Sequence, residues 1–513
     1  MTPQTVGAVL HAAAQDHPAR PALQWFAGGE LTSLTWRDMV TLAEAGAAAL
    51  RTAPHSDAPV ALWGPNSPAW VVLFYAAALS GRPLVPINPN LTDAEVAVLL
   101  ADSRASTVLA AGELVGRGER LGHGAAGDIE VLDLQDWYGR LAVADSVSVD
   151  NSGSAHVRPT DPFLIQYTSG TTGTPKGAVL THAACLEAAH SMALHLRLND
   201  HEIWCSPVPL HHVGGSIAMA LAPATMAGTY VMVADFAAGS FVSAAHESRA
   251  TLLGGVPTLF LRILDDPELS RVQLPALSAV IVGGASIAPD LVQRLELHFG
   301  VPAAVFYGQS EGPVLTATDL HDPPSIKADT VGRPLPNRQV RIVDPVSGDP
   351  LAVGETGEIV VRTPTAMCEY LNRPDQTAQT IDADGWLHTG DLGCLDATGL
   401  LRFRGRLKEM IVRGGENVYA VEVENAIASH PDVDLVAVVG LPDERFGEIV
   451  AAAVIPVPGS SLSAEQLTRH VEGTLAPFKR PVRWHITDQL PMTASGKVQK
   501  FRIVEAMADE DVL

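Results

Sequence analysis

Short apolar runs alternate with longer helical stretches, and this alternation constrains the fold more than any other feature of the sequence. The clearest units are strand–helix–strand patterns over residues 60–86 and 279–307, with helices expected at Ala69–Leu79 and Pro289–Phe299. Such units predict parallel strands with helices on the faces of the sheet and ligands at the carboxyl ends of the strands. We therefore expect an α/β fold in which layered βαβ units build a large domain.

A chain of 513 residues is too long for a single hydrophobic core, so the sequence predicts two or more domains. From Val340 to Phe403, short strands and Gly/Asp turns replace the βαβ pattern and predict a β-rich subdomain. Beyond it, two strands and a helix expected between residues 435 and 475 indicate a small α+β domain. We place the boundary at Lys408, which gives a large N-terminal domain (1–407) and a small C-terminal domain (408–513).

Composition narrows the classes of function. The net charge of −23 and the pI of about 5.1 argue against nucleic acid or an anionic membrane as partner. The uncharged segment Ile203–Ala234 is interrupted by prolines and glycines, so we expect a buried helix and a core strand there and no transmembrane segment. Four scattered cysteines and an N-terminus without a basic region predict a cytoplasmic protein with reduced thiols. The sequence is compatible with either a monomer or a homodimer.

The segment Tyr167–Gly177 has the composition of a loop that binds a polyphosphate. It follows an apolar run and contains three glycines, five Ser or Thr hydroxyl groups and Lys176. Glycines let consecutive N–H groups turn toward one anion, and the lysine adds a mobile positive charge. It is not a Walker loop, which requires Ser or Thr where this chain has Gly177. A flexible surface loop is the alternative interpretation.

Five further motifs follow in chain order: Pro209–Gly215, Tyr307–Gly312, Gly385–Asp391, Gly405–Tyr419 and Pro491–Lys497. Together with the glycine-rich segment, they resemble the motifs of the adenylate-forming superfamily of acyl-CoA synthetases, adenylation domains and luciferases. The resemblance covers essentially the whole chain and favours the acyl-CoA synthetase branch. It implies a large N-terminal domain, a small mobile C-terminal domain, and a reaction in which ATP converts a carboxylate to an acyl-adenylate before transfer to a thiol.

The resemblance also implies roles for individual residues. The implied catalytic residues are Lys497, Glu311 and His212; Glu311 would hold Mg²⁺, and Lys497 would neutralise charge at the reacting carboxylate. Lys408 would be the hinge of the small domain. The implied ATP site consists of Thr168, Ser169, Gly170, Thr171, Thr172, Gly173, Lys176, Tyr307, Ser310, Asp391, Arg406 and Lys497. The implied acyl pocket consists of His212, Gly214, Gly215, Ala218 and Gly284. The implied CoA site consists of Gly414, Gly415, Phe446, Phe478 and Arg480.

Each role has a simpler structural alternative. The carboxylates also suit turns and helix N-caps, Lys497 suits a solvated position, and His212 suits a hydrogen-bonded place in the core. The aromatic and cationic residues of the implied CoA site could equally serve packing beside two prolines. Lys327 and Lys500 are expected to be surface charges.

Three positions depart from the usual motifs. Ser310 replaces a threonine, His211 replaces an aromatic residue before the motif histidine, and Ala420 replaces a proline. None of these changes removes a catalytic group.

The uncharged segment Ile203–Ala234 lines the acyl site in the family, and it has no cation that could pair with a second carboxylate. We therefore expect an apolar monocarboxylic acid (fatty, alicyclic, aromatic or terpenoid) as substrate, with ATP and CoA as co-substrates. Two alternatives remain open: an adenylating enzyme that loads a separate carrier protein, and a non-catalytic relative that binds an acyl group or a nucleotide.

Overall fold

The computed structural model of the chain describes residues 4–122, 129–143, 156–168, 175–285, 287, 290–492 and 498–509. Contacts divide the chain into two compact units: residues 1–340 with 361–388, and residues 341–360 with 389–513. This division distributes the β-rich segment over both units. The predicted domain boundary at Lys408 stays a prediction.

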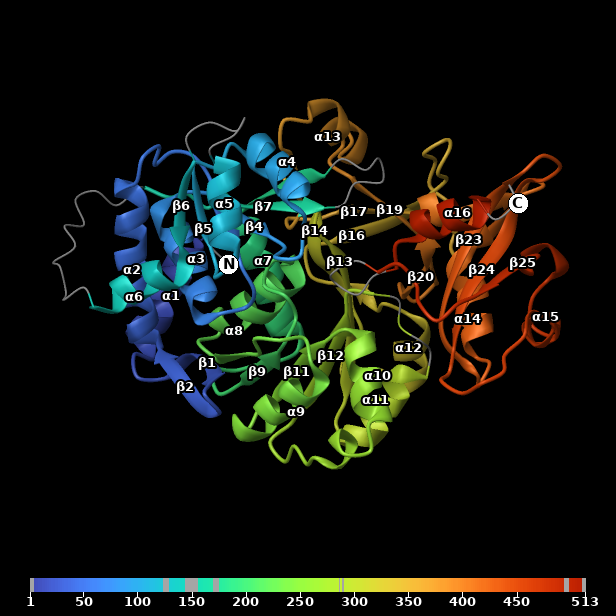
Figure 1. The fold of residues 1–513 in the computed structure, drawn as a ribbon, viewed down its shortest axis with the longest axis horizontal. Helices are drawn as coiled ribbons and strands as arrows, with labels where there is room; N and C mark the ends of the chain where they lie inside the picture. Colours follow the sequence, from blue (N-terminus) through green and yellow to red (C-terminus); the bar gives the residue numbers. More distant parts are fainter. Residues whose placement is uncertain are drawn as a thin grey trace. The chain divides into compact units, whose positions relative to one another are not determined.

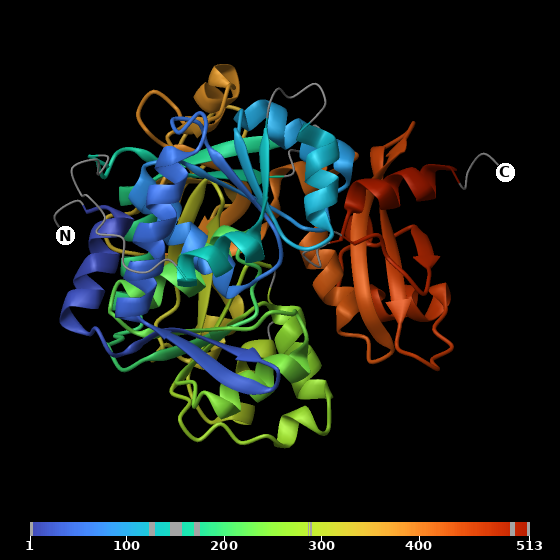
Figure 2. The same ribbon diagram turned by 60° about the vertical axis from the view of Figure 1, so that its left-hand side comes forward.

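The first unit contains a mainly parallel sheet with antiparallel strands at both edges (Figure 1). Its order is β15-β14-β13-β12-β11-β9-β10-β1-β2, and the strands from β13 to β1 are parallel. The hairpin β1–β2, blue in Figure 2, forms one end. The bounds are β1 Pro21–Ala27, β2 Glu30–Thr35, β9 Ile203–Ser206, β10 Thr229–Met232, β11 Leu252–Gly255, β12 Ala279–Gly283, β13 Ala303–Gln309, β14 Gly312–Ala317 and β15 Arg333–Pro334.

A second sheet of the same unit has the order β18-β8-β7-β4-β3-β5-β6. The bounds are β3 Val60–Trp63, β4 Leu84–Ile87, β5 Thr107–Ala110, β6 Glu130–Asp133, β7 Pro162–Thr168, β8 Lys176–Thr181 and β18 Glu369–Tyr370. The short strand β18 lies antiparallel to β8. This pairing brings a segment from far along the chain next to the glycine-rich motif.

Helices cover both faces of the two sheets, because each sheet has apolar side chains on both sides. The helices α1 Val6–Asp16, α2 Trp36–Thr52, α3 Pro68–Ser80 and α7 His182–His195 contribute to a core that includes strands of both sheets. The helices α9 Ala238–Glu247, α10 Pro257–Asp265 and α11 Leu291–Phe299 cover the outer face of the first sheet. The helices α4 Asp93–Ser103 and α5 Leu114–Gly122 cover that of the second. The remaining helices are α6 Leu134–Val143, α8 Ala222–Ala224, α12 Pro324–Asp329 and α13 Pro374–Thr380.

Helix α3 illustrates how the local sequence and the core agree. Its first turn is capped by the Ser67 hydroxyl, Pro68 occupies the first helical position, and Gly81 ends it with φ of +77°. These are favoured residues at those positions. The helix is apolar all round and buried along nearly its whole length, as expected for a helix between two sheets.

The second unit is built mainly on antiparallel strands, and β25 lies parallel to β24. One sheet has the order β16 Gln339–Val343, β17 Gly357–Arg362, β19 Leu387–Leu395 and β20 Leu401–Arg406. Strands β16, β17 and β19 each include two residues that are assigned to the first unit. The other has the order β22-β21-β24-β23, with β25 on β24. The bounds are β21 Met410–Arg413, β22 Glu416–Tyr419, β23 Val433–Asp443, β24 Gly447–Pro456 and β25 Arg483–Ile486. The helices α14 Ala420–Ala428 and α15 Ala464–Glu472 pack on one face, and α16 Lys500–Asp509 packs on the other.

The α/β fold predicted from the sequence is confirmed, as is the β-rich region that follows it. The uncharged segment 203–234 forms β9, a π-helix at Gly214–Leu221, α8 and the core strand β10. Within the described residues, no helix combines the length and the hydropathy that a membrane span requires.

The prediction that Lys327 and Lys500 are surface charges was wrong. Lys327 is 2% exposed, and its ammonium donates to Glu296 at 2.7 Å and to the carbonyl of Leu320 at 2.6 Å. Lys500 lies between the carboxylates of Glu409 and Glu424, at 2.8 Å from each. Burial lowers the pKa of Lys500, but the two carboxylates together raise it above its ordinary value. Both lysines are paired, which a sequence cannot reveal because their partners lie far along the chain.

Candidate active site

Strands β7 and β8 of the second sheet form an antiparallel pair beside the short edge strand β18, and they contain the two ends of the glycine-rich motif. In this pair Thr168 lies opposite Lys176. Gly177 packs tightly here, because a Cβ atom would lie 2.9 Å from the Ile165 side chain. The predicted phosphate-binding residues Ser169, Gly170, Thr171, Thr172 and Gly173 lie outside the described residues.

The hairpin β13–β14 carries Tyr307, Ser310 and Glu311. Its register shifts between Tyr307 and Gln309, and a Cβ at Gly308 would come within 2.5 Å of the Val314 nitrogen. Val314 has φ of +53°, a conformation that costs a β-branched residue roughly 1–3 kcal/mol. Its carbonyl accepts from the buried Arg338 guanidinium at 2.9 Å. The turn that bears Glu311 is therefore tightly constrained.

Four side chains from these segments and from β18 meet at one place, which we call the phosphate corner: Thr168, Lys176, Glu311 and Tyr370. The Tyr370 hydroxyl donates to Glu311 Oε1 at 2.7 Å, and the Thr168 hydroxyl donates to the same oxygen at 3.5 Å. The Lys176 ammonium lies 5.1 Å from the centre of the Tyr370 ring. Burial, followed by the Glu311 carboxylate, raises the pKa of Tyr370 above its ordinary value, so the phenol is a hydrogen-bond donor.

Three of these four residues are among those predicted from the sequence, and Tyr370 is not. The neighbouring residues carry no recognisable motif, and the strand β18 that contains Tyr370 is only two residues long. Its place depends on the pairing of Tyr370 with Ala178 across β18 and β8, and on the Met367 N–H, which donates to the Glu311 carbonyl at 2.8 Å. These segments come together only through the tertiary fold.

The phosphate corner suits a magnesium ion that arrives with its nucleotide. Among the described residues, no group of three or more His, Cys, Asp or Glu side chains could hold a metal ion. Mg²⁺ is usually bound by one or two carboxylates together with substrate phosphates and water. The oxygen donors of Glu311 and Thr168 fit that mode of binding, and Glu311 would be the protein ligand.

The segment around His212 is held by buried polar side chains. Asn66 accepts from the Leu210 N–H at 2.8 Å and donates to the carbonyls of Val208 and Val233. Gln166 donates to the His211 carbonyl at 2.9 Å. These contacts fix the backbone that presents the predicted acyl-site histidine, and neither amide was identified from the sequence.

The residues after His212 form a π-helix, a rare element that often occurs at functional sites. A Cβ at Gly215 would lie 2.2 Å from the Pro209 carbonyl oxygen, whereas one at Gly214 would make only an ordinary contact with Val208 at 3.6 Å. Gly215 therefore permits close packing, and only Gly214 leaves space. Ala218 is buried in the same π-helix, and Gly284, with φ of +81°, follows strand β12.

His211, the residue that departs from the family pattern, is also buried. Burial, reinforced by the adjacent His212, lowers the pKa of His211 to about 3. Its Nε2 has no hydrogen-bond partner among the described residues. His211 is therefore neutral throughout the physiological range of pH.

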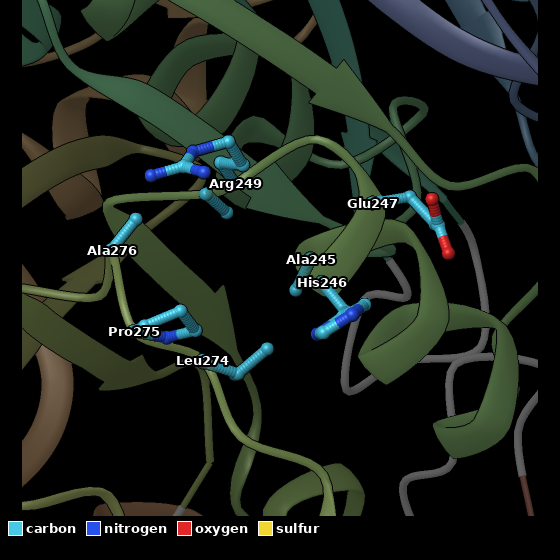
Figure 3. A pocket seen from close by; sticks show the side chains of 8 residues that line it. Ala245, His246, Glu247, Arg249, Leu274, Pro275 and Ala276 are labelled. Carbon is cyan, nitrogen blue, oxygen red and sulfur yellow. The ribbon is translucent and has the colours of Figure 1, made fainter.

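A shallow hollow of about 220 Å³ lies elsewhere in the first unit, between the end of α9 and the segment before β12. Figure 3 shows His246 and Leu274 facing it, while the carboxylate of Glu247 points away. None of the residues predicted for the ATP, acyl or CoA sites lines this hollow. The hollow is therefore separate from the candidate active site.

In the second unit, Asp391 and Arg406 lie opposite each other on β19 and β20. Asp391 is 7% exposed, and its carboxylate lies 3.6 Å from the Arg406 guanidinium. The roles predicted for Asp391 and Arg406 toward the ribose stay predictions. Lys408 lies in a one-turn 3₁₀-helix at Leu407–Glu409, and Lys497 lies outside the described residues.

The predicted CoA residues lie near Arg413, which was not among the predicted site residues. Gly414 and Gly415 form the two-residue turn between β21 and β22, with φ of +62° and +88°, as a tight hairpin requires. The Arg413 guanidinium lies 5.4 Å from the centre of the Phe446 ring and donates to the Phe478 carbonyl at 2.8 Å. We call Arg413, Arg445, Phe446 and Phe478 the arginine patch.

Two of the predicted CoA residues also have structural partners. Arg480 donates to the carbonyls of Leu475 at 2.9 Å and Glu472 at 2.8 Å, and so satisfies groups at the end of α15. Phe478 packs partly against the core of the second unit. Their roles toward CoA stay predictions.

Comparison with known proteins identifies two family models in the chain. Residues 10–371 match the AMP-binding enzyme model, and residues 422–497 match the AMP-binding enzyme C-terminal domain model. A 3-[(3aS,4S,7aS)-7a-methyl-1,5-dioxo-octahydro-1H-inden-4-yl]propanoyl:CoA ligase of Rhodococcus jostii is 35% identical, over 86% of this chain and 87% of the relative. A feruloyl-CoA synthase of Amycolatopsis sp is 36% identical over the same shares. The crystal structure of ATP-bound MatB from Rhodopseudomonas palustris, 26% identical, superposes with a TM-score of 0.87 over 99% of each chain.

Proposed function

The chain belongs to the AMP-binding enzyme family, and we infer from its relatives and its phosphate corner that it is an AMP-forming acid–CoA ligase. The enzyme activates a carboxylic acid with ATP to an acyl-adenylate, with release of pyrophosphate. It then transfers the acyl group to the thiol of CoA and releases AMP. The curated relatives that support this function include a feruloyl-CoA synthase and an indoleacetate–CoA ligase.

The phosphate corner is the single observation that carries the proposal for the first half-reaction. Glu311 presents a carboxylate, Thr168 a hydroxyl group and Lys176 a cation within one partly buried network. When bound, Mg²⁺ would neutralise charge on the phosphates and orient them for attack. Lys176 can follow the phosphates because its ammonium is a compact charge on a flexible stem, while Glu311 stays fixed by its hydrogen bonds.

We propose that the second unit supplies the groups for the ribose and for CoA. Asp391 would accept hydrogen bonds from the ribose hydroxyl groups, with Arg406 alongside. The arginine patch offers ring faces for stacking and guanidinium groups for phosphate. Lys497 would stabilise the charge that builds as the carboxylate attacks.

We propose an apolar monocarboxylic acid as the substrate. No Lys or Arg lies between residues 203 and 234, and a second carboxylate buried there would remain unpaired, at a cost of several kcal/mol (order of magnitude). Two of the relatives are named for acyl groups that carry rings, which is consistent with a bulky acid.

Pyrophosphate release measured with ATP, Mg²⁺ and a panel of acids tests the function, with and without CoA. We expect acid-dependent pyrophosphate release and an acyl-CoA product. Acid-dependent pyrophosphate release without acyl-CoA would favour a carrier-protein-loading enzyme, and no release with any acid would favour a non-catalytic relative.

A paired substitution tests the acyl site. Gly214→Leu should shift preference toward smaller acids, because a side chain can enter the space there. Gly215→Leu should instead lower stability, because its Cβ would clash with the Pro209 carbonyl. A higher kcat/KM for malonate or an amino acid than for octanoate, benzoate and a polycyclic acid would contradict the proposed substrate class.

We also propose that the enzyme works in the cytoplasm, since its four cysteines are free and three of them are buried. Sedimentation of the purified protein would decide between a monomer and a homodimer.

A further inference from the structure

Tyr370 is the member of the phosphate corner to which the sequence assigned no role. We propose that it is a positioning residue: its hydroxyl group orients the Glu311 carboxylate toward the magnesium ion, and its ring holds the Lys176 ammonium apart from that carboxylate. The inference rests on the proposed function, because it assigns Glu311 to the metal and Lys176 to the phosphates.

The backbone around Tyr370 is fixed on both sides. The Tyr370 N–H donates to the Thr377 hydroxyl at 2.9 Å, and the next N–H, of Leu371, donates to the Gly177 carbonyl at 2.8 Å. Tyr370 is 6% exposed. Its phenol therefore has little freedom to turn, and it reaches Glu311 from a rigid base that belongs to the same sheet as Lys176.

The hydrogen bonds leave one side of the carboxylate for a cation. Among the described residues, both hydrogen bonds to the Glu311 carboxylate, from Tyr370 and from Thr168, reach Oε1. Oε2 can thus meet Mg²⁺ while Oε1 anchors the group. A hydroxyl donor brings no positive charge of its own to the carboxylate, so it does not compete with a metal cation as an ion-pair partner would.

The Tyr370 side chain contacts both charged groups of the corner, Lys176 with its ring and Glu311 with its hydroxyl group. The Lys176 ammonium lies over the ring face at 5.1 Å from its centre, while the hydroxyl group at the ring edge contacts Glu311. A cation is attracted to such a face by the quadrupole of the ring. A direct Lys176–Glu311 ion pair would occupy both groups, and it would have to break before ATP and Mg²⁺ could bind. The phenol makes that ion pair unnecessary and keeps both groups available.

Two substitutions separate the two roles. Tyr370→Phe removes the hydroxyl group and keeps the ring, so we expect the Mg²⁺ concentration for half-maximal pyrophosphate release to rise about tenfold or more, since hydrogen bonds to charged groups are among the stronger ones. The rate at saturating Mg²⁺ should change much less. Tyr370→Leu removes the ring as well, and the KM for ATP should rise in addition.

Direct binding provides a readout besides activity. Calorimetric titration of the protein with ATP should show the same loss in Tyr370→Phe when Mg²⁺ is present and no loss when it is replaced by EDTA. In a Glu311→Gln background, Tyr370→Phe should have no further effect on Mg²⁺ dependence. Tyr138→Phe, which removes a hydroxyl group from another partly buried tyrosine of the same unit, is the matched control and should match the wild type.

An unchanged Mg²⁺ dependence in Tyr370→Phe, with an active wild type, would overturn this inference and leave the proposed function standing. A wild type that releases no pyrophosphate with any acid would instead overturn the proposed function. If Tyr370→Phe lost thermal stability and ATP binding equally with and without Mg²⁺, its role would be structural, and the inference would again fail.

Discussion

The phosphate corner and the arginine patch bind, in our proposal, the two anionic co-substrates, yet they are built in different ways. The corner is a network of side chains, in which two hydroxyl groups fix one carboxylate and a ring face supports one ammonium. The patch consists of cations over an aromatic ring, with Arg413 and Arg445 at 5.4 and 5.0 Å from the centre of Phe446, beside a turn defined by its backbone.

The difference corresponds to two chemical tasks. At the corner, charge develops during the reaction, and groups that are preorganised by hydrogen bonds stabilise such charge best. At the patch, a long cofactor only needs to be held, and contacts to ring faces tolerate small displacements. We therefore expect substitutions at the corner to have large effects on the first half-reaction, and substitutions in the arginine patch to have smaller effects on the second half-reaction.

Glu311→Gln should have the largest effect. Loss of one preorganised electrostatic group typically lowers the rate by about 10²–10³-fold, and here the loss should fall on adenylate formation measured as pyrophosphate release. Glu247→Gln, an exposed carboxylate beside the hollow of Figure 3, should be neutral. A normal rate in Glu311→Gln would remove the basis for distinguishing the corner from the patch.

Lys408→Pro should affect the other half-reaction. Proline fixes φ near about −65°. At position 408 it should therefore restrict the backbone rotation by which the small domain, according to the family resemblance, moves between the two half-reactions. We expect thioester formation to fall by about tenfold or more, with pyrophosphate release nearly unchanged, in single-turnover assays. Lys408→Ala is the control. Equal loss of both steps would count against a hinge at this position.

His211→Phe tests whether the burial of His211 in the first unit makes the stability of the protein depend on pH. The folded protein holds the pKa of His211 at about 3, below the ordinary value of about 6.5, so the unfolded chain binds the proton more readily. Stability from the neutral histidine is thus present above pH 6.5 and is lost as the pH falls below it. At pH 5 the loss is about 2 kcal/mol.

Urea unfolding of wild type and His211→Phe at pH 7 and pH 5 measures this difference. We expect the substitution to reduce the pH dependence of the free energy of unfolding, although His182, with a pKa lowered to about 4 by burial, will retain its own share. The exposed residue His201, changed to Gln, should not reduce it. An identical pH dependence in wild type and His211→Phe would refute the burial of His211.

Arg413→Gln should have the smallest effect. Loss of one exposed cation–π contact costs roughly 0.5–1 kcal/mol, so the KM for CoA should rise by about two- to fivefold while pyrophosphate release stays normal. Arg469→Gln, which removes an exposed arginine of α15, is the control. If Arg413→Gln impaired adenylation as strongly as Glu311→Gln does, the two regions would not have separate tasks.

Local patterns in the sequence are sufficient to predict the α/β fold and the family. They carry this information because a strand, a tight turn and a capped helix are each specified by neighbouring residues. Thus the helix predicted at Ala69–Leu79 is α3, which spans Pro68–Ser80, and the glycine-rich motif is recognisable from its composition. The family resemblance that these motifs carry also implies that Thr168, Lys176 and Glu311 belong to one nucleotide site.

The residues that complete the site depend on contacts between distant parts of the chain. Tyr370 reaches Glu311 because β18 pairs with β8, and Arg413 joins Phe446 to Phe478 through contacts across separate strands and turns. The same holds for Lys327, which the sequence predicts as a surface charge and which is buried against Glu296. Such pairings depend on how whole sheets and helices pack, so no local pattern of residue types can specify them.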